Sequence, residues 1–380
     1  MDKKVIFFYS NHREDDPTIG ITRKVKGQIN ALRRMNFIVY YSAYKKNGIG
    51  IFDNDNQMIQ FTALKNVNSK IGHIKRRWVL LKTCSDFITN SEISIDYGYL
   101  RFHFFDRDYL KLLKCIKSKG GINIVEAHAY PYRFHWFCKM FPIYFIDMLY
   151  TPAVKKYIDL VAAISTCQNV WGIRTVNIDN AIEIEKYKLQ KKKESNKIRI
   201  ITVSNEQQGH AYYKVINGLA DYYEHGGTED IILNLVGTYM KSTKDLIDKL
   251  HLTDRVVFWG KLSGEKLDIV FDESDIGLGA FSYRKESESG SCIKTKEYFA
   301  RGVPFINGWQ EPAFDENYPY VLKFDTKEES IDFYRVVEFY KRIGKNGNIA
   351  NEMREFAYSH YNWESQFRLV FNAIKKQDSV

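Results

Sequence analysis

The stretch SGSCIKTKEYFARGVPFI, from Ser289 to Ile306, combines the residue types that a phosphate site needs. Ser289, Gly290 and Ser291 are small enough for backbone amides to approach a ligand closely. The helix that follows begins near Lys294, and the unpaired amides of a helix N-terminus favour a bound anion. Glu297 lies one turn further, where a carboxylate can accept two hydrogen bonds from the neighbouring hydroxyls of a ribose. The segment therefore indicates a nucleotide site.

The charges in this segment support the same interpretation. Lys294 and Lys296 stand in the first turn of the expected helix, where the helix dipole disfavours cations unless an anion is bound. The alternative is a plain surface strand and helix joined by a serine-rich loop. The pattern alone fits both interpretations equally well.

The elements around these residues form a strand, a loop, a helix and a second strand. We expect DIGLGAF to be a strand, residues 282–292 a loop, IKTKEYFAR a helix, Gly302 its C-terminal cap and VPFI the next strand. Apolar runs alternate with helical patterns along nearly the whole chain, which is typical of parallel sheets covered by helices. The expected fold class is therefore α/β, with two doubly wound Rossmann-like domains.

A polar, lysine-rich interval marks the expected domain boundary. We expect an N-terminal domain over residues 1–185, a linker over 186–197, a second domain over 198–358 and a C-terminal helix over 359–380. Ligands of open α/β sheets bind at the carboxyl ends of the strands. We therefore expect the site in a cleft where the strand ends of the two domains face each other.

The composition excludes several classes of protein. The 380 residues are 44% apolar and 15% aromatic, as in a folded chain long enough for two domains. The N-terminal apolar run is too short for a signal peptide, and no segment reaches about eighteen uncharged apolar residues. We therefore expect a cytoplasmic protein. Its five cysteines lack the spacing of a zinc site or a disulfide framework, so we expect reduced thiols.

The net charge of +10 indicates an anionic partner. Nucleic acid, phosphorylated metabolites and acidic lipid headgroups would all satisfy it. We expect no nucleic acid, because the sequence has no RNA-binding signature and no zinc-finger spacing. The segment HIKRRWVLLK, from His73 to Lys82, interleaves Arg76 and Arg77 with Trp78 and Leu81. It fits a helix lying on an anionic bilayer, and an ordinary amphipathic surface helix equally well.

The segment KTKEYFARGVPFI resembles the donor-site helix of retaining GT-B glycosyltransferases of family 4. In that family a segment of the form E-x7-E is followed by an alanine, a glycine and a proline-led strand. Glu297 falls on the second glutamate, which in the family holds the nucleotide ribose, and Ala300, Gly302 and Pro304 match the tail. The first glutamate, which in the family lies by the donor sugar, falls on Ser289. This departure bears on the donor and on the usual catalytic assignment.

The resemblance extends over most of the chain. HAYYKVINGLADYY is similar to the family's helix after the first strand of the donor domain, where a basic residue contacts the diphosphate. His210 falls where a lysine is usual, and Lys214 lies one helical turn further. Gly20 matches the glycine-containing loop that approaches the donor phosphates and the acceptor. YNWESQF resembles the start of the terminal helix that returns to the first domain.

Candidates on the acceptor side follow two strands of the first domain. VEAHAYPY places Glu126 and His128 on one side of a strand end, and such a pair favours a functional role over a structural one. We expect Glu126 to orient the acceptor hydroxyl, with His128 as the second candidate. Arg101 falls where the family has a histidine near the reacting sugar. An arginine cannot act as a base at neutral pH, but it can clamp a phosphate with two hydrogen bonds.

The resemblance implies a retaining glycosyltransferase with a nucleoside diphosphate sugar as donor, and we expect a UDP-sugar. The expected acceptor is a glycan or a polyprenyl-diphosphate-linked glycan, as in bacterial capsule and surface polysaccharide synthesis at the inner face of the membrane. The implied reaction is a front-face displacement in which helix amides and basic groups stabilise the leaving diphosphate. We expect no obligatory metal and no cofactor, because no D-x-D cluster follows a strand. The alternatives are a non-catalytic GT-B partner of another transferase and a nucleotide-sugar epimerase.

Overall fold

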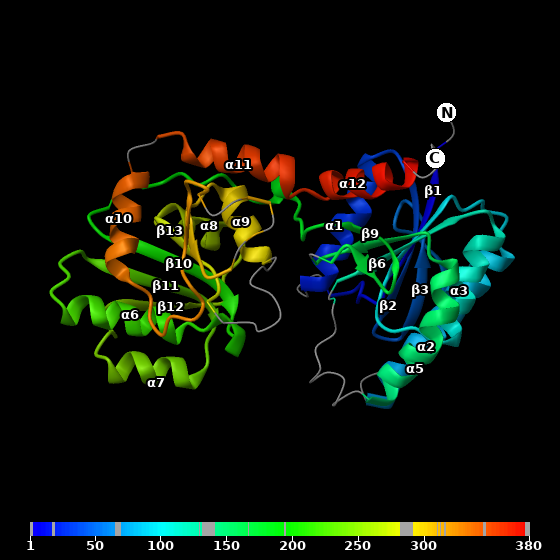
Figure 1. The fold of residues 1–380 in the computed structure, drawn as a ribbon, viewed down its shortest axis with the longest axis horizontal. Coiled ribbons are helices and arrows are strands. Elements are labelled where there is room, and N and C mark those ends of the chain that lie inside the picture. Colours follow the sequence, from blue (N-terminus) through cyan, green and yellow to red (C-terminus); the bar gives the residue numbers. More distant parts are fainter. Residues whose placement is uncertain are drawn as a thin grey trace. The chain divides into compact units, whose positions relative to one another are not determined.

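The computed structural model forms two compact units, each with its own sheet and its own hydrophobic core (Figure 1). The first unit comprises Met1–Asp179 and Trp363–Val380, and the second comprises Asn180–Asn362. The structure describes residues 3–16, 20–64, 70–128, 130, 141–165, 167–193, 195–281, 292–309, 311, 313–314, 317–344 and 347–376.

The sheet of the first unit has the order β4-β3-β2-β1-β5-β6-β7-β9-β8 in the described part of the chain. Its centre, from β2 to β9, is parallel, whereas β3, β4 and β8 pair antiparallel with their neighbours. Central strands such as VIFFY are apolar throughout because both faces of the parallel sheet are covered. The strands are β1 Val5–Tyr9, β2 Ile38–Lys45, β3 Gly48–Phe52, β4 Met58–Ala63, β5 Tyr97–Arg101, β6 Ile122–Ala127, β7 Leu160–Ala163, β8 Asn169–Val170 and β9 Ile173–Asn177.

The helices of this unit bury one apolar face each, with one exception. In α1, Val25, Ile29 and Leu32 recur at helical spacing and are buried. The terminal helix α12 packs on the same unit, where Phe371 stacks on Phe37 with ring centroids 4.8 Å apart. The predicted return of this helix to the first domain is confirmed. The exception is α5, whose side chains are largely exposed. The helices are α1 Gly20–Arg34, α2 Lys70–Asn90, α3 Arg107–Ser118, α5 Phe141–Val154 and α12 Trp363–Lys375.

The sheet of the second unit is parallel, with the order β12-β11-β10-β13-β14-β15 in the described part. Its strands are β10 Ile198–Asn205, β11 Ile231–Thr238, β12 Val256–Gly260, β13 Ile276–Leu278, β14 Phe305–Asn307 and β15 Val321–Lys323. Its helices are α6 Tyr213–Glu224, α7 Lys241–Lys249, α8 Glu265–Asp272, α9 Ile293–Arg301, α10 Phe333–Ile343 and α11 Ile349–His360.

The helix expected over IKTKEYFAR is confirmed as α9. Gly302 ends it in the left-handed conformation, with φ of 72°, and its amide bonds back to the last turn. A Cβ at this position would lie 2.3 Å from the Cα atom of Ala350 in α11. Glycine is therefore required here for the backbone conformation and also for the packing of α11.

The domain boundaries differ from the sequence prediction. The change of unit falls between Asp179 and Asn180, and again between Asn362 and Trp363, instead of within a linker over 186–197. That lysine-rich segment is held on the second unit, because Gln190 donates to the carbonyls of Phe271 and Ser274 and the Lys193 amide donates to Asp272. Its polar composition reflects an exposed surface position and not a free linker.

Candidate functional site

Each sheet reverses its strand order at one point, and ligands of such sheets bind at the carboxyl ends of the strands there. In the first unit the reversal lies between β1 and β5, and in the second unit it lies between β10 and β13. Four of the predicted site residues, Arg101, Glu126, His210 and Lys294, lie near these two positions.

In the second unit, α9 begins after Cys292, which makes no side-chain hydrogen bond to the helix amides. Among the described residues no side-chain cap is recorded for its first-turn amides, which are the groups that favour an anion. Ser289, Gly290 and Ser291, predicted to line the same site, lie outside the described residues.

Glu297 lies one turn into α9 and is held in place by Arg301. The Arg301 Nε atom donates to Glu297 Oε1 at 2.9 Å, and its Nη1 atom donates to Asp268 at 2.7 Å. The Arg301 guanidinium also stacks on the ring of Phe271, with 4.3 Å between the guanidinium carbon and the centroid. The side chain of Glu297 keeps 15% of its surface exposed. Its carboxylate is thus positioned by the helix and can still be reached.

Lys294 and His210 meet through a residue that the sequence did not single out, Tyr212. The Lys294 ammonium donates to the Tyr212 hydroxyl at 2.7 Å, and the His210 ring lies 5.3 Å from the Tyr212 ring. The Tyr212 hydroxyl also bonds Thr202 and Ser204, at the end of β10. These contacts gather two predicted donor-site residues at the β10–β13 reversal point, around a buried tyrosine.

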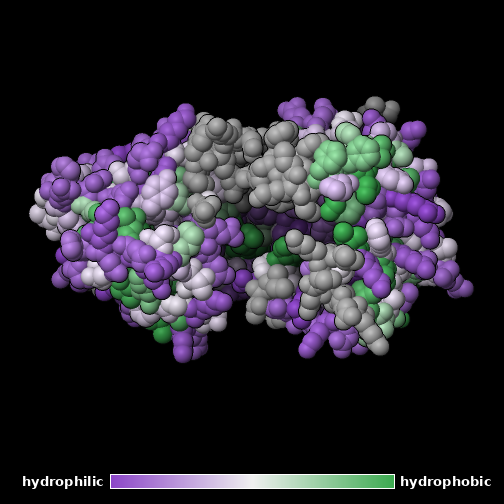
Figure 2. All heavy atoms as spheres, turned by 90° about the horizontal axis from the view of Figure 1, so that it is seen from below, coloured by the Kyte–Doolittle hydropathy of each residue, from purple (hydrophilic) through white to green (hydrophobic). Residues whose placement is uncertain are grey.

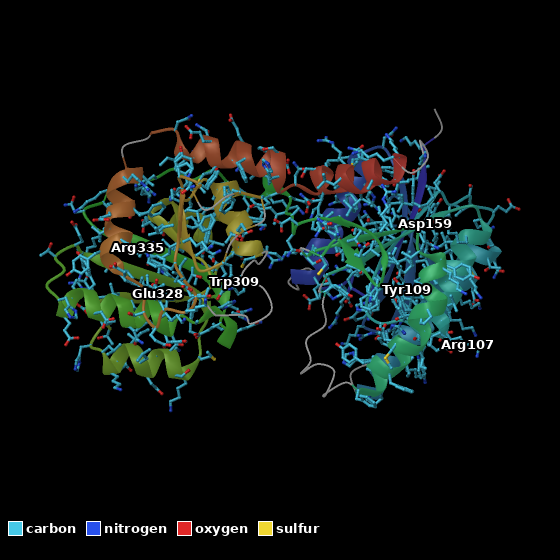
Figure 3. The ribbon with its side chains drawn as sticks, viewed as in Figure 1. Arg107, Tyr109, Asp159, Trp309, Glu328 and Arg335 are labelled. Carbon is cyan, nitrogen blue, oxygen red and sulfur yellow. The ribbon has the colours of Figure 1, made fainter. Side chains whose placement is uncertain are left out.

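Lys214 does not belong to this group, and its predicted place beside a diphosphate was wrong. A short 3-10 turn ends at His210, Ala211 has a positive φ of 51°, and α6 starts only at Tyr213. His210 and Lys214 therefore do not share one helix face. Lys214 is buried, and its ammonium donates to the carbonyls of Thr326 at 2.8 Å and of Glu328 at 2.6 Å. Figure 3 labels Glu328, which lies in the loop before α10, the helix that carries Arg335.

Lys296 also differs from the expectation of a cation that needs a phosphate. Its side chain and that of Glu311 are both fully buried and form an ion pair. Thr295 donates to the other oxygen of the same carboxylate at 2.7 Å. Glu311 thus neutralises the charge of Lys296 at the positive end of the helix dipole, without a bound phosphate. Of the two lysines in the first turn, only Lys294 remains a candidate for contact with the nucleotide.

In the first unit, Glu126 is the centre of a buried charge cluster. It has no exposed surface, and it accepts hydrogen bonds from Gln28 at 2.6 Å and from the Tyr99 hydroxyl at 2.9 Å. Lys24 Nζ lies 3.0 Å from the carboxylate and Arg101 Nε lies 3.7 Å from it. Burial alone would raise the pKa of Glu126, but the two cations and Gln28 hold that pKa well below its usual range.

The predicted role of Glu126 is therefore corrected. A carboxylate without exposed surface cannot orient an acceptor hydroxyl, because its oxygens already face Lys24, Gln28 and Tyr99. It positions Lys24 and Arg101 instead. Sequence reasoning missed Lys24, although its position four residues after Gly20, in the first turns of α1, was a signal.

His128 lies just past β6, and its ring is 6.3 Å from that of His103, which lies just past β5. Both residues keep exposed surface, but the atoms packed around them still desolvate their rings. Desolvation of the ring, followed by the charge of Arg101, lowers the pKa of His128 to about 4. Desolvation of the His103 ring, and after it the electrostatic effect of His128, lowers the pKa of His103 to about 3. Both imidazoles are therefore neutral at pH 7.

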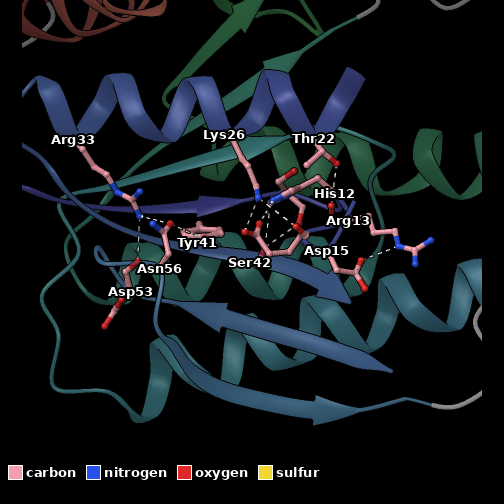
Figure 4. Close-up of polar contacts among 12 residues, drawn as sticks. His12, Arg13, Asp15, Thr22, Lys26, Arg33, Tyr41, Ser42, Asp53 and Asn56 are labelled. Atoms are coloured by element: carbon pink, nitrogen blue, oxygen red, sulfur yellow. Dashed lines mark hydrogen bonds and ion pairs between the residues drawn. The ribbon is translucent and has the colours of Figure 1, made fainter. Parts of the chain in front are cut away.

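Gly20 is the first residue of α1, and open space surrounds the position of a Cβ there. The loop before it carries a second polar cluster that the sequence did not predict (Figure 4). His12 is buried, and its Nε2 atom lies 2.9 Å from Glu14, which pairs with Lys26 of α1 at 2.9 Å. Thr22 donates to the carbonyl of Arg13. These contacts fasten the loop after β1 to α1.

The helix predicted to contact a membrane, α2, buries three of the five residues chosen for that role, namely Arg76, Arg77 and Leu81. Arg76 and Arg77 are 7% and 4% exposed, and Leu81 is fully buried. Arg77 forms an ion pair with Asp106 and donates to the carbonyl of Phe104, and Arg76 stacks on Tyr44. The other two, Trp78 and Lys82, are exposed. No helix within the described ranges is long and apolar enough to cross a bilayer.

No family model matches this chain, and no curated protein is significantly similar to it in sequence. Solved structures match it over its whole length. A glycosyltransferase from Rickettsia africae is 12% identical, with a TM-score of 0.67 over 99% of both chains. HepE of Anabaena, solved in complex with UDP, is 13% identical, with a TM-score of 0.62 over 98% of this chain and 100% of that one. The catalytic domain of starch synthase IV from Arabidopsis thaliana, bound to ADP and acarbose, is 10% identical, with a TM-score of 0.61 over the full length of both chains.

Identities this low show the fold. The chain has the GT-B fold of these glycosyltransferases, with two Rossmann-like units. The fold-class prediction is confirmed. Function has to be argued from the residues at the strand ends, because one fold serves many activities.

Proposed function

We propose that this chain is a retaining glycosyltransferase that takes a sugar from a nucleoside diphosphate donor, with UDP as the expected nucleotide. The observation that supports the proposal most is the group at the β10–β13 reversal point. There an uncapped helix N-terminus, the cation Lys294 and the accessible carboxylate Glu297 lie within one and a half turns of α9. These groups match the phosphates and the ribose of a nucleotide in charge and in order.

In the proposed reaction the leaving diphosphate gains negative charge as the bond to the sugar breaks. The amides of the first turn of α9 and the Lys294 ammonium stabilise that charge. The hydroxyl of Tyr212 holds Lys294, and Arg301 holds Glu297, so neither group has to be ordered during the reaction. The proposal assigns no role to a metal.

The test is the release of nucleoside diphosphate from a panel of nucleotide sugars, with and without a mixture of glycan and polyprenyl-diphosphate-linked acceptors. A transferase releases the nucleotide faster with acceptor, and NMR of the product shows the donor's anomeric configuration. Binding of a nucleotide without turnover on any acceptor would support a non-catalytic partner instead. Inversion of the anomeric centre would overturn the retaining assignment.

We further propose that the acceptor is presented by an anionic bilayer and that α5, not α2, meets the bilayer surface. In α5 only Asp147 and Val154 are buried. Five large apolar side chains of this helix are at least 38% exposed, namely Phe141, Phe145, Ile146, Met148 and Leu149. The helix lies on the lower side of the first unit in Figure 1, and the view from below in Figure 2 shows hydrophobic surface on that unit.

Charge beside α5 favours anionic lipid as the occupant. Lys155 and Lys156 follow the helix directly and are exposed. The neighbouring helix α3 exposes Arg107, Lys111 and Lys114, of which Figure 3 labels the first. A short apolar helix flanked by cations binds the bilayer interface by partial insertion and by attraction to acidic headgroups. With 14 residues, α5 is too short to span the bilayer.

Co-sedimentation with neutral and phosphatidylglycerol-containing vesicles tests this surface. Wild type should bind only anionic vesicles, less so at high salt, and the Met148→Asp, Leu149→Asp variant should stay in the supernatant. Ile269→Asp, at a residue of α8 that is 52% exposed, is the matched control and should bind like wild type. The proposal is overturned if wild type does not bind anionic vesicles. It is also overturned if wild type forms a dimer and the α5 variant is a monomer.

A further inference from the structure

The carboxyl ends of β5 and β6 hold two cations beside a buried carboxylate. Glu126 lies 3.0 Å from Lys24 Nζ and 3.7 Å from Arg101 Nε, and the charge of Asp179 also acts on Lys24. Lys24 also lies over the ring of Trp363, 5.4 Å from its centroid. Lys24 and Arg101 are nearly buried, with side chains that are 8% and 7% exposed. These charged groups thus lie in a poorly hydrated place, where a buried donor without a partner is costly.

Arg101 has a donor to spare. Its Nη1 atom is buried and has no hydrogen-bond partner within the described part of the chain. Buried guanidinium N–H groups are normally paired, because an unpaired donor has lost its water without gaining a partner. The unpaired nitrogen is at the end of β5, beside the sheet's reversal point. A ligand oxyanion would complete its hydrogen bonding.

The two histidines give this cluster a route to the surface. His103 and His128 follow the same two strands, are exposed, and lie edge to face. Arg101 pairs with Glu126 in the parallel register of β5 and β6, so His103 and His128, two residues further along each strand, lie at the same end of the sheet as the cations. The pKa of His128 is lowered to about 4, chiefly by desolvation, so the neutral ring carries one N–H donor at pH 7.

We propose that Arg101, Lys24 and His128 form a binding site for an oxyanion of the acceptor, a phosphate or a carboxylate. The acceptor would then be a phosphorylated or acidic glycan. Naming the ligand as the acceptor rests on the proposed function, whereas the oxyanion site itself does not. Arg101 supplies the paired donors that suit an oxyanion, Lys24 supplies charge, and Glu126 positions both.

The test uses the full-length protein with inorganic phosphate and with glucuronate as probes. Ring ¹⁵N NMR follows the pKa of His128, and calorimetry follows affinity. Phosphate should raise the pKa of His128, because a nearby anion favours the imidazolium. Arg101→Met should weaken phosphate binding by at least tenfold, and His128→Phe by a smaller factor. Lys82→Met, at an exposed residue of α2, should bind phosphate like wild type.

Three outcomes would overturn the inference. They are an unchanged pKa of His128 at saturating phosphate, equal phosphate affinity in Arg101→Met and wild type, and displacement of phosphate by UDP. The last would assign the site to the donor diphosphate. Because Arg101→Met can perturb the Glu126 cluster, His128→Phe at the exposed ring provides the second variant. The protein can bind phosphate even if it turns over no nucleotide sugar. Each of the two proposals can therefore be wrong while the other is right.

Discussion

Replacing Glu297 with alanine tests whether α9 binds a nucleotide ribose. The carboxylate is 15% exposed and pairs with Arg301 four residues further along the helix. Loss of such a pair costs a helix roughly 0.2–0.5 kcal/mol, so the variant should remain folded. A charged hydrogen-bond partner contributes about 1.5–3 kcal/mol. The affinity for UDP should therefore fall roughly 10- to 150-fold.

Calorimetry with UDP and 2′-deoxy-UDP shows where this energy comes from. Wild type should prefer UDP, because the deoxy ligand lacks one hydroxyl that the carboxylate accepts from. Glu297→Ala should bind both ligands equally. Glu338→Ala removes an exposed carboxylate of α10 and should behave like wild type. Unchanged UDP affinity in Glu297→Ala, or an undiminished preference for UDP over the deoxy ligand, would refute the ribose assignment.

Three further predictions concern Lys296, Lys214 and His128. Lys296→Met leaves Glu311 without its cation, and should lower the free energy of unfolding by about 3–5 kcal/mol in urea denaturation, with partial recovery on adding Glu311→Gln. Lys214→Met leaves two carbonyls unpaired, and should lower stability by roughly 1–3 kcal/mol without changing UDP affinity. Desolvation and Arg101 lower the folded pKa of His128 to about 4, below its unfolded value of about 6.5. Protonation therefore favours the unfolded chain, and this contribution to stability should be lost as the pH falls from about 6.5 towards 4, with the His128 ring titrating below pH 5 by NMR.

Each of these has a result that contradicts it. Full stability of Lys296→Met would mean that Glu311 gains solvent or another partner. A loss of UDP affinity in Lys214→Met, with the nucleoside unaffected, would restore Lys214 to the diphosphate site. A His128 ring that titrates near pH 6.5 would mean that neither desolvation nor Arg101 acts on it.

The fold and the helix α9 could be predicted because their signals are local. Apolar strands, the helical spacing in α1 and the glycine that ends α9 each depend on a few neighbouring residues. Partners distant in sequence could not be predicted in this way. Lys296 and Glu311 are both charged, and only packing shows that they neutralise each other. The sequence predicts that the basic run in α2 lies at the surface. In the fold, Asp106 lies beside Arg77 and forms an ion pair with it.

Glu126 and His128, at the end of β6, show a second limit of sequence reasoning. Alternation along a strand correctly groups Glu126 with His128, but it does not give the depth of either side chain. Glu126 is buried because Lys24 and Gln28 of α1 close over it. The break between His210 and α6 likewise depends on Ala211 in a positive-φ conformation, which its residue type does not predict.

The two places where the chain changes unit have a practical meaning for dissecting the protein. Ile182 bridges Asn362, and its amide donates to the Tyr361 carbonyl at 2.9 Å, while the Asp179 amide donates to Gln366 at 2.7 Å. The outgoing and returning segments thus run side by side, and the second unit is an insertion into the first. Residues 180–362 form one continuous segment of the chain, and a short turn from Asp179 to Trp363 would close the remainder. Deleting the C-terminus instead removes α12 from the first unit, so a simple truncation would damage the unit that it was meant to isolate.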